Sequence, residues 1–124
     1  MINIQRHFLR KYSRDEVDSL VVEAAARIRT LVPGVVEITV FGSALTDHFD
    51  DVADLDLVLI FGDEVAAHAA EKLLYRNAHT FSRPIDFLCV DRKTFKEKSD
   101  VGGVFWIAAK EGRVVYRSET QPGN

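Results

Sequence analysis

Two aspartates separated by one residue are the part of this sequence best suited to chemistry. Asp54 and Asp56 open a stretch, residues 54–61, that reads as a β-strand, so both side chains point to one face. The rest of that face, Val58 and Ile60, is apolar. Two carboxylates about 5 Å apart repel by roughly 3 kcal/mol at an effective dielectric constant of about 20. A fold gains nothing from this repulsion, so we expect a cation, and hard oxygen ligands favour Mg2+ or Mn2+.

A third carboxylate, Asp86, lies near the head of another apolar stretch, residues 84–90. An aspartate among strand residues this apolar should be paired, liganded or functional. If the strands expected at 54–61 and 84–90 are neighbours, Asp54, Asp56 and Asp86 meet at one edge of a sheet. Three carboxylates can hold two metal ions, and two metal ions support an in-line phosphoryl displacement.

A glycine and a serine, Gly42 and Ser43, follow the first expected strand and suit a phosphate. Gly42 lets the backbone approach a phosphate closely because it has no side chain. We expect Ser43 to cap a short helix, whose unpaired N–H groups would face the anion, and its hydroxyl could donate a further hydrogen bond.

The elements that must position these residues follow from apolar periodicity and end signals. The capping box of Ser13 and Glu16 predicts a helix from Arg14 to the Pro33-Gly34 break. Strands are expected at 35–41, 54–61, 84–90 and 114–116, a second helix at 64–78, and a last helix capped by Ser99 and ended by Gly112. This order favours an α+β, two-layer fold with a mixed central sheet and helices mainly on one face. Glu37 and Thr39 suggest that the other face is partly open.

Composition narrows the class of protein. The 124 residues fit one domain, expected at 13–117, with an N-terminal arm at 1–12 that is locally basic and a flexible tail at 118–124. The net charge of −3 argues against broad nucleic-acid binding. The single cysteine, Cys89, is expected in the core and suits a reducing compartment, and no apolar run reaches the length of a membrane span. With no export signal at the N-terminus, a cytoplasmic location is expected.

The pattern Gly-Ser, ten residues, Asp-x-Asp, and a strand aspartate about thirty residues later resembles the DNA polymerase beta-type nucleotidyltransferase superfamily. Within that superfamily, the chain resembles the minimal nucleotidyltransferases. This resemblance implies a nucleotidyltransferase fold, with Asp54, Asp56 and Asp86 binding Mg2+ or Mn2+, Asp86 also helping to activate the acceptor hydroxyl, and Ser43 holding the triphosphate. It further implies transfer of a nucleoside monophosphate, AMP from ATP or the equivalent from another NTP. The implied acceptor is a tyrosine of a helical HEPN-type partner, to which this chain would be the antitoxin.

Alternatives stay open at this stage. The residue after the Gly-Ser pair is Ala44, where many relatives have a basic or aromatic side chain; Arg83 and Lys110 are candidate replacements for that phosphate contact. Trp106 is expected in the core or at an interface. The chain could be a binding module without turnover, an antitoxin that acts by complex formation only, or a small-molecule nucleotidyltransferase of the aminoglycoside type. A homodimer could supply the acceptor pocket in place of a partner.

Overall fold

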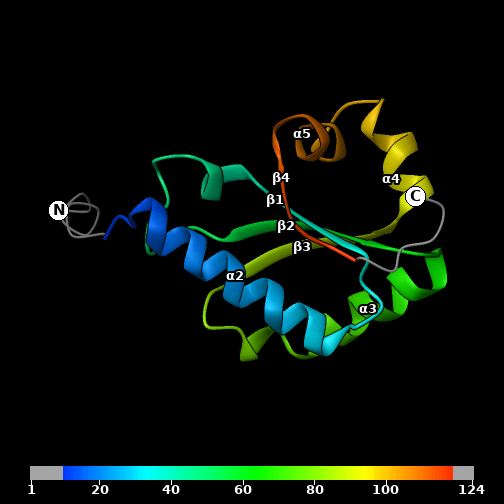
Figure 1. Cartoon of the computed structure of the whole chain (residues 1–124), viewed down its shortest axis with the longest axis horizontal. Helices are drawn as coiled ribbons and strands as arrows, with labels where there is room; N and C mark the ends of the chain where they lie inside the picture. The colour runs from blue at the N-terminus through cyan, green and yellow to red at the C-terminus, as the bar shows by residue number, and fades with distance from the viewer. Residues whose placement is uncertain (1–9, 119–124) are drawn as a thin grey trace, which may run out of the picture.

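The helix expected from Arg14 begins where the capping box predicts it. A computed structural model describes residues 10–118, so the expected segments 1–9 and 119–124 of the arm and tail lie outside the described residues. Helix α2 spans Arg14–Leu31 (Figure 1). The Ser13 hydroxyl accepts a hydrogen bond from the Glu16 amide at 3.1 Å, and the Glu16 carboxylate accepts one from the Ser13 amide at 2.9 Å. The two bonds satisfy donors that the start of a helix otherwise leaves unpaired.

A mixed sheet of four strands carries the fold. The strands are β1 (Glu37–Phe41), β2 (Leu55–Phe61), β3 (Ile85–Asp91) and β4 (Arg113–Arg117), in the spatial order β3-β2-β1-β4. Strand β1 pairs antiparallel with β2 and β4, whereas β2 and β3 are parallel. Helix α3 (Glu64–Arg76) makes the crossover between the two parallel strands, as parallel pairing requires. The expected mixed sheet and α+β class are confirmed.

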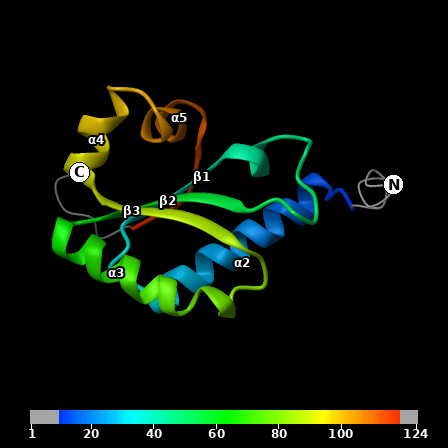
Figure 2. The same cartoon turned by 180° about the vertical axis from the view of Figure 1, so that it is seen from behind.

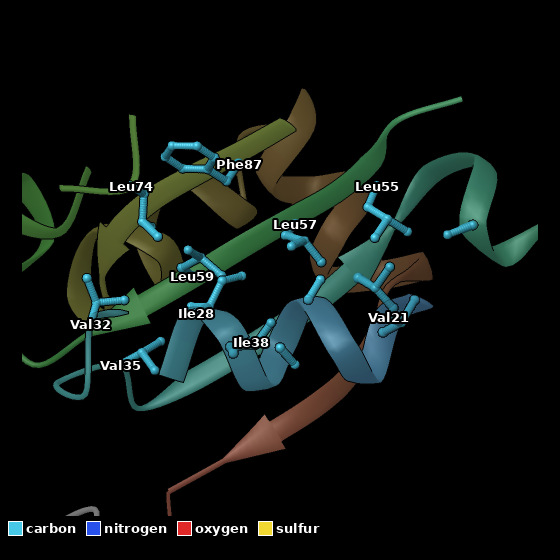
Figure 3. Close-up of a cluster of buried hydrophobic side chains, with 14 of the residues drawn as sticks. Val21, Ile28, Val32, Val35, Ile38, Leu55, Leu57, Leu59, Leu74 and Phe87 are labelled. Carbon is cyan, nitrogen blue, oxygen red and sulfur yellow. The ribbon is translucent and has the colours of Figure 1, made fainter. Parts of the chain in front are cut away.

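The two long helices and the two short ones lie on opposite sides of this sheet. Figures 1 and 2 show α2 and α3 on one side and α4 (Arg92–Ser99) and α5 (Val104–Glu111) on the other. The larger core lies between the sheet and α2 and α3, and Figure 3 shows Leu57 and Leu59 facing Ile28 across it. A smaller core on the second side contains Val58, Ile60, Val90 and Ala108. The larger apolar face of the sheet therefore belongs to α2 and α3.

The sequence prediction of a partly open second face is wrong at the two positions on which it rested. Glu37 and Thr39 are buried, with exposed fractions of 6% and 4%, because α5 contacts β1 on that side. The Glu37 carboxylate accepts hydrogen bonds from Arg92 at 3.3 Å and from Arg117 at 3.1 Å. Paired in this way, a carboxylate can be buried at low cost.

The last helical region also differs from its prediction. Ser99 does not cap the last helix, because it ends α4, a helix that the sequence analysis did not anticipate. Asp91 caps α4 by accepting a hydrogen bond from the Thr94 amide at 3.1 Å, and Gly103 precedes α5 without a side-chain cap. None of the helices within residues 10–118 combines the length and the apolar character that crossing a membrane demands.

Candidate active site

Parallel pairing of β2 and β3 brings two of the predicted carboxylates side by side. Asp56 and Asp86 are direct partners in the register of the two strands. The heads of the strands are tied just outside the sheet, where the Leu55 amide donates to the Pro84 carbonyl at 3.1 Å. Asp54 lies one residue before β2. The expectation that the two strands are neighbours is therefore confirmed.

The aspartate pair belongs to the second side of the sheet. Side chains alternate along a strand, so Asp56 shares its face with Val58 and Ile60, which pack in the smaller core with Ala108 of α5. Partners in a parallel register share a face, and Asp86 therefore lies on the same side. The pair occupies the end of the sheet that the apolar packing of α5 leaves uncovered, with Asp86 exposed and Asp56 half-buried.

Among residues 10–118, no salt bridge joins Asp54, Asp56 or Asp86 to a basic side chain. Burial raises the pKa of Asp56, and the neighbouring charges of Asp86 and Asp54 raise it further. Within residues 10–118, no three His, Cys, Asp or Glu side chains are already arranged as a metal-binding group. A Mg2+ ion in a phosphoryl-transfer site is usually held by one or two carboxylates, with substrate phosphates and water as the other ligands. The oxygen donors of this pair fit that mode of binding, and the complete three-aspartate site stays a prediction.

Gly42 lies against Asp56. It has a φ of +75°, in the left-handed region that favours glycine, and a Cβ at this position would collide with the Oδ2 atom of Asp56. Phe41, the residue before it, is the register partner of Asp56 across β1 and β2. The turn and the carboxylate are thus packed together, and only glycine allows this approach.

Ser43 does not cap a helix, contrary to the sequence prediction. Gly42–Leu45 forms a short 3-10 helix, η1, that contains Ser43 and follows Phe41 without any side-chain cap. The Ser43 carbonyl accepts hydrogen bonds from the Thr46 amide at 3.0 Å and from the Thr46 hydroxyl at 2.8 Å. Its own hydroxyl has no hydrogen-bond partner among the described residues, so it remains available to a ligand. Its predicted contact with a triphosphate is not tested by this arrangement.

The residues considered as phosphate contacts divide into three cases. Ala44 is buried, with 1% of its surface exposed, so its side chain packs in the core. Arg83 is 8% exposed and its guanidinium binds backbone carbonyls of the loop before β2, which makes the suggested phosphate contact wrong. Lys110 is exposed on α5, and its suggested role is not tested. The sequence analysis thus missed a structural role for Arg83. The one signal available in the sequence was that Arg83 directly precedes Pro84, where a strand was expected to begin.

Two clefts are lined by residues other than Asp54, Asp56 and Asp86. A cleft of about 750 Å3 runs between α3 and β3 and continues to α4 and α5; Cys89, Asp91 and Phe105 are among its lining residues. Burial, with a smaller contribution from the charge of Glu71, raises the pKa of the Cys89 thiol to about 12. Cys89, expected in the core, is half-buried and packs against the larger core. A second cleft of about 240 Å3 lies between α2 and residues 80–83.

Comparisons with known proteins agree with this fold. Residues 21–115 match the nucleotidyltransferase domain family. A protein of Sulfolobus solfataricus assigned as a nucleotidyltransferase has a similar structure, with a TM-score of 0.56, 18% identity and 86% of each chain covered. A mutant of the MntA–HpeT toxin–antitoxin has a TM-score of 0.45 and 13% identity, over 87% of this chain and 75% of that one. No curated protein sequence matches the chain significantly. Because the family match spans most of the sequence and the fold agrees with it, this chain belongs to the nucleotidyltransferase domain family.

Proposed function

We propose that this protein is a metal-dependent nucleotidyltransferase that moves a nucleoside monophosphate, AMP from ATP, onto a hydroxyl acceptor. The observation that carries the proposal is the in-register pair of Asp56 and Asp86, with the Gly42 turn packed on Asp56. Membership of the nucleotidyltransferase domain family supports the type of reaction. The choice of ATP and of a tyrosine acceptor follows from the resemblance to minimal nucleotidyltransferases.

Asp54, Asp56 and Asp86 are the residues proposed to hold Mg2+ or Mn2+. When bound, such an ion neutralises charge on the transferred phosphoryl group and on the leaving pyrophosphate. Burial, and then the charges of Asp86 and Asp54, raise the pKa of Asp56, so its ionised form is disfavoured in the absence of a cation. Its ionised form should therefore become more favourable when a cation arrives, which is the behaviour expected of a ligand.

Gly42 and Ser43 are proposed to hold the triphosphate. The glycine turn brings the backbone next to Asp56, so a phosphate seated there would lie beside the carboxylates. The Ser43 hydroxyl has no partner in the described part of the chain and can donate to a phosphate oxygen. Both contacts are to the phosphates, and neither residue would select the base.

Asp86 is proposed to assist the acceptor. Asp86 and Asp54 are exposed, whereas Asp56 is half-buried, so an incoming hydroxyl can reach Asp86 from solvent. The choice of Asp86 over Asp54 follows from the resemblance to minimal nucleotidyltransferases. A carboxylate within hydrogen-bond distance can orient the hydroxyl and accept its proton as the oxygen attacks the α-phosphorus and pyrophosphate leaves. Positioning supplies much of the rate in phosphoryl transfer.

The acceptor is proposed to come from a second polypeptide, a tyrosine of a HEPN-type helical partner. Neither the 750 Å3 cleft nor the 240 Å3 cleft is lined by the three aspartates, so neither would hold an acceptor next to them. In this reading the chain acts as an antitoxin that modifies its partner. A homodimer that completes the pocket is the competing arrangement.

Two measurements test the proposal. The wild-type chain should be co-expressed with the neighbouring gene product. In the presence of Mg2+ or Mn2+, and not without them, it should release pyrophosphate from ATP. The mass of the partner should increase by whole AMP units. Asp56→Asn should abolish both, and Asp47→Asn, an exposed aspartate in the adjacent loop, should leave both intact. Tight complex formation without any mass increase would instead indicate a binding module. Efficient modification of a free aminoglycoside by the chain alone would indicate a small-molecule transferase.

A further inference from the structure

We propose that Arg83 is a positioning residue for the active site: its guanidinium holds the loop before β2 and thereby places the carboxylate of Asp54. The inference rests on the proposed function, because it assigns Arg83 a part in building that same site. Arg83 is the only arginine or lysine buried within residues 10–118, and it lies just before β3.

The Arg83 guanidinium donates hydrogen bonds to three oxygens, two backbone carbonyls and one hydroxyl. Its Nε and Nη2 atoms donate to the Ala53 carbonyl at 3.1 Å and 2.7 Å. Nη2 also donates to the Asp50 carbonyl, and Nη1 donates to the Tyr12 hydroxyl at 3.3 Å. The Ala53 carbonyl belongs to the peptide group that leads into Asp54. Arg83 therefore fixes the orientation of the peptide from which Asp54 extends.

Aromatic rings hold the guanidinium in place. Its central carbon lies 4.7 Å from the ring centroid of Phe49 and 5.1 Å from that of Tyr12. The two rings meet edge to face, with centroids 5.8 Å apart. A planar fork with several donors can bind two carbonyls and lie against these rings at once, which the single ammonium group of lysine cannot do.

The three aspartates differ in what positions them, and this difference gives Arg83 its importance. Asp56 and Asp86 are fixed by the register of β2 and β3. Asp54 precedes β2 and has no strand partner, so the path of residues 50–54 decides where its carboxylate lies. Arg83 spans both ends of that path by binding Asp50 and Ala53, and it does so from the chain that enters β3.

The chain before α2 completes the same clamp. The Tyr12 amide donates to the Phe49 carbonyl at 3.0 Å, and Lys11 forms a β-bridge with Asp50. Residues 10–12, which the sequence analysis assigned to an arm, are thus built into the support of the loop. Arg83 joins this support to the strand that carries Asp86.

The test compares Arg83→Met, Arg83→Lys and the control Arg27→Met in the full chain. Arg27 donates to the Thr80 hydroxyl near the same segment but does not touch the loop. Mn2+ binding is measured by electron paramagnetic resonance, with and without ATP, and exchange of the Ala53 amide, which donates to Asp50, is followed by NMR. Arg83→Met should weaken Mn2+ binding about 10–100-fold, as loss of a residue behind a metal ligand typically does, and should speed exchange at Ala53. Arg83→Lys should fall between wild type and Arg83→Met, and Arg27→Met should change neither measurement.

The outcomes separate this inference from the proposed function. Wild-type Mn2+ affinity in a folded Arg83→Met protein would overturn the positioning role, as would an equal loss in Arg27→Met. If Arg83→Met does not fold, Arg83→Lys decides: unchanged Mn2+ binding in that variant refutes the role, and weaker binding with a native melting curve supports it. In the transfer assay, kcat should fall more than the KM for ATP rises. A wild-type protein that binds Mn2+ but transfers no nucleotide would refute the proposed function while leaving the role of Arg83 supported by binding and exchange.

Discussion

Replacing Asp56 by asparagine should stabilise the protein in the absence of metal while it destroys the site. The substitution keeps the size of the side chain and removes a carboxylate whose pKa is raised by burial and by two neighbouring aspartates. A charge that the fold disfavours at neutral pH is thereby deleted. The expected gain in stability is thus the counterpart of the expected loss of function.

The magnitude follows from the strand register. Neighbouring strands lie about 4.8 Å apart, and Asp56 and Asp86 are register partners, so we take about 5 Å as the separation of their carboxylates. Two unit charges at this distance repel by ~0.8 kcal/mol in bulk water and by about 3 kcal/mol at an effective dielectric constant of about 20. Because Asp86 is exposed to solvent, the repulsion should be closer to the value in bulk water. We therefore expect Asp56→Asn to raise the free energy of unfolding by about 1–2 kcal/mol. For a chain of this size, that raises Tm by roughly 3–8 °C.

The dependence on pH has a definite sign. The pKa of the Asp56 carboxyl is higher in the folded than in the unfolded state, so the protonated carboxyl favours folding. This stabilisation is lost as the pH rises from the unfolded pKa through the folded pKa. The unfolded value for aspartate is about 3.9, so the advantage of Asp56→Asn should appear above about pH 4 and level off once the folded carboxyl has ionised. Near pH 3 the two proteins should be equally stable.

Thermal and urea unfolding of wild type, Asp56→Asn and the control Asp47→Asn, all in EDTA, provide the assay. Asp47 is exposed, so its substitution removes the same charge without relieving a buried repulsion. Adding Mn2+ and ATP should then raise the Tm of wild type and not that of Asp56→Asn. The reasoning would be refuted if Asp56→Asn were no more stable than wild type at pH 7, or if its advantage persisted unchanged at pH 3.

Four further predictions concern other parts of the molecule. Gly42→Ala should lower stability by about 1–3 kcal/mol and abolish metal binding, because the φ of +75° and the neighbouring carboxylate exclude a Cβ; Gly62→Ala, where a Cβ meets nothing, is the control in the same unfolding assay. Ser43→Ala should raise the KM for ATP several-fold and leave base preference unchanged in steady-state assays, since only a phosphate contact is lost. Glu37→Gln should lower the free energy of unfolding, measured with urea, by about 1–2 kcal/mol, because it removes the buried negative charge that pairs with Arg92 and Arg117. The Cys89 thiol, whose pKa is about 12, should react slowly with iodoacetamide up to about pH 10, and rapid labelling of the native protein would contradict its burial.

Strand periodicity accounts for the part of the site that could be predicted from the sequence. Asp56 shares a face with Val58 and Ile60 because side chains alternate, and Asp86 meets it because both stretches are apolar enough to be adjacent in one sheet. The helix that begins at Arg14 could also be predicted from the sequence, because its capping box is a local pattern. These features depend on short-range chemistry, which a single sequence contains.

The features that were missed depend on partners distant in the chain. Helix α4 is polar apart from Phe95, so it offers no apolar period by which to recognise it. Glu37 appeared to be a surface residue because Arg92 and Arg117, which pair with it, are 55 and 80 residues away. Arg83 could be assigned to a ligand for the same reason, because nothing local shows that its partners are the carbonyls of Asp50 and Ala53.

The proposed site thus combines two ways of holding mutually repelling groups. Asp56 and Asp86 lie on paired strands, where backbone hydrogen bonds fix their separation even though their charges oppose it. Asp54 lies on a loop that Arg83 secures, and its charge adds to the repulsion that raises the pKa of Asp56. A loop ligand can move by a small amount when a cation and its phosphate ligands arrive, whereas strand ligands cannot. This explains how three carboxylates could serve one site although the side chains of residues 10–118 contain no metal-binding group already formed. On this view Arg83 limits how far Asp54 can move, and the strength of metal binding should follow the strength of that clamp.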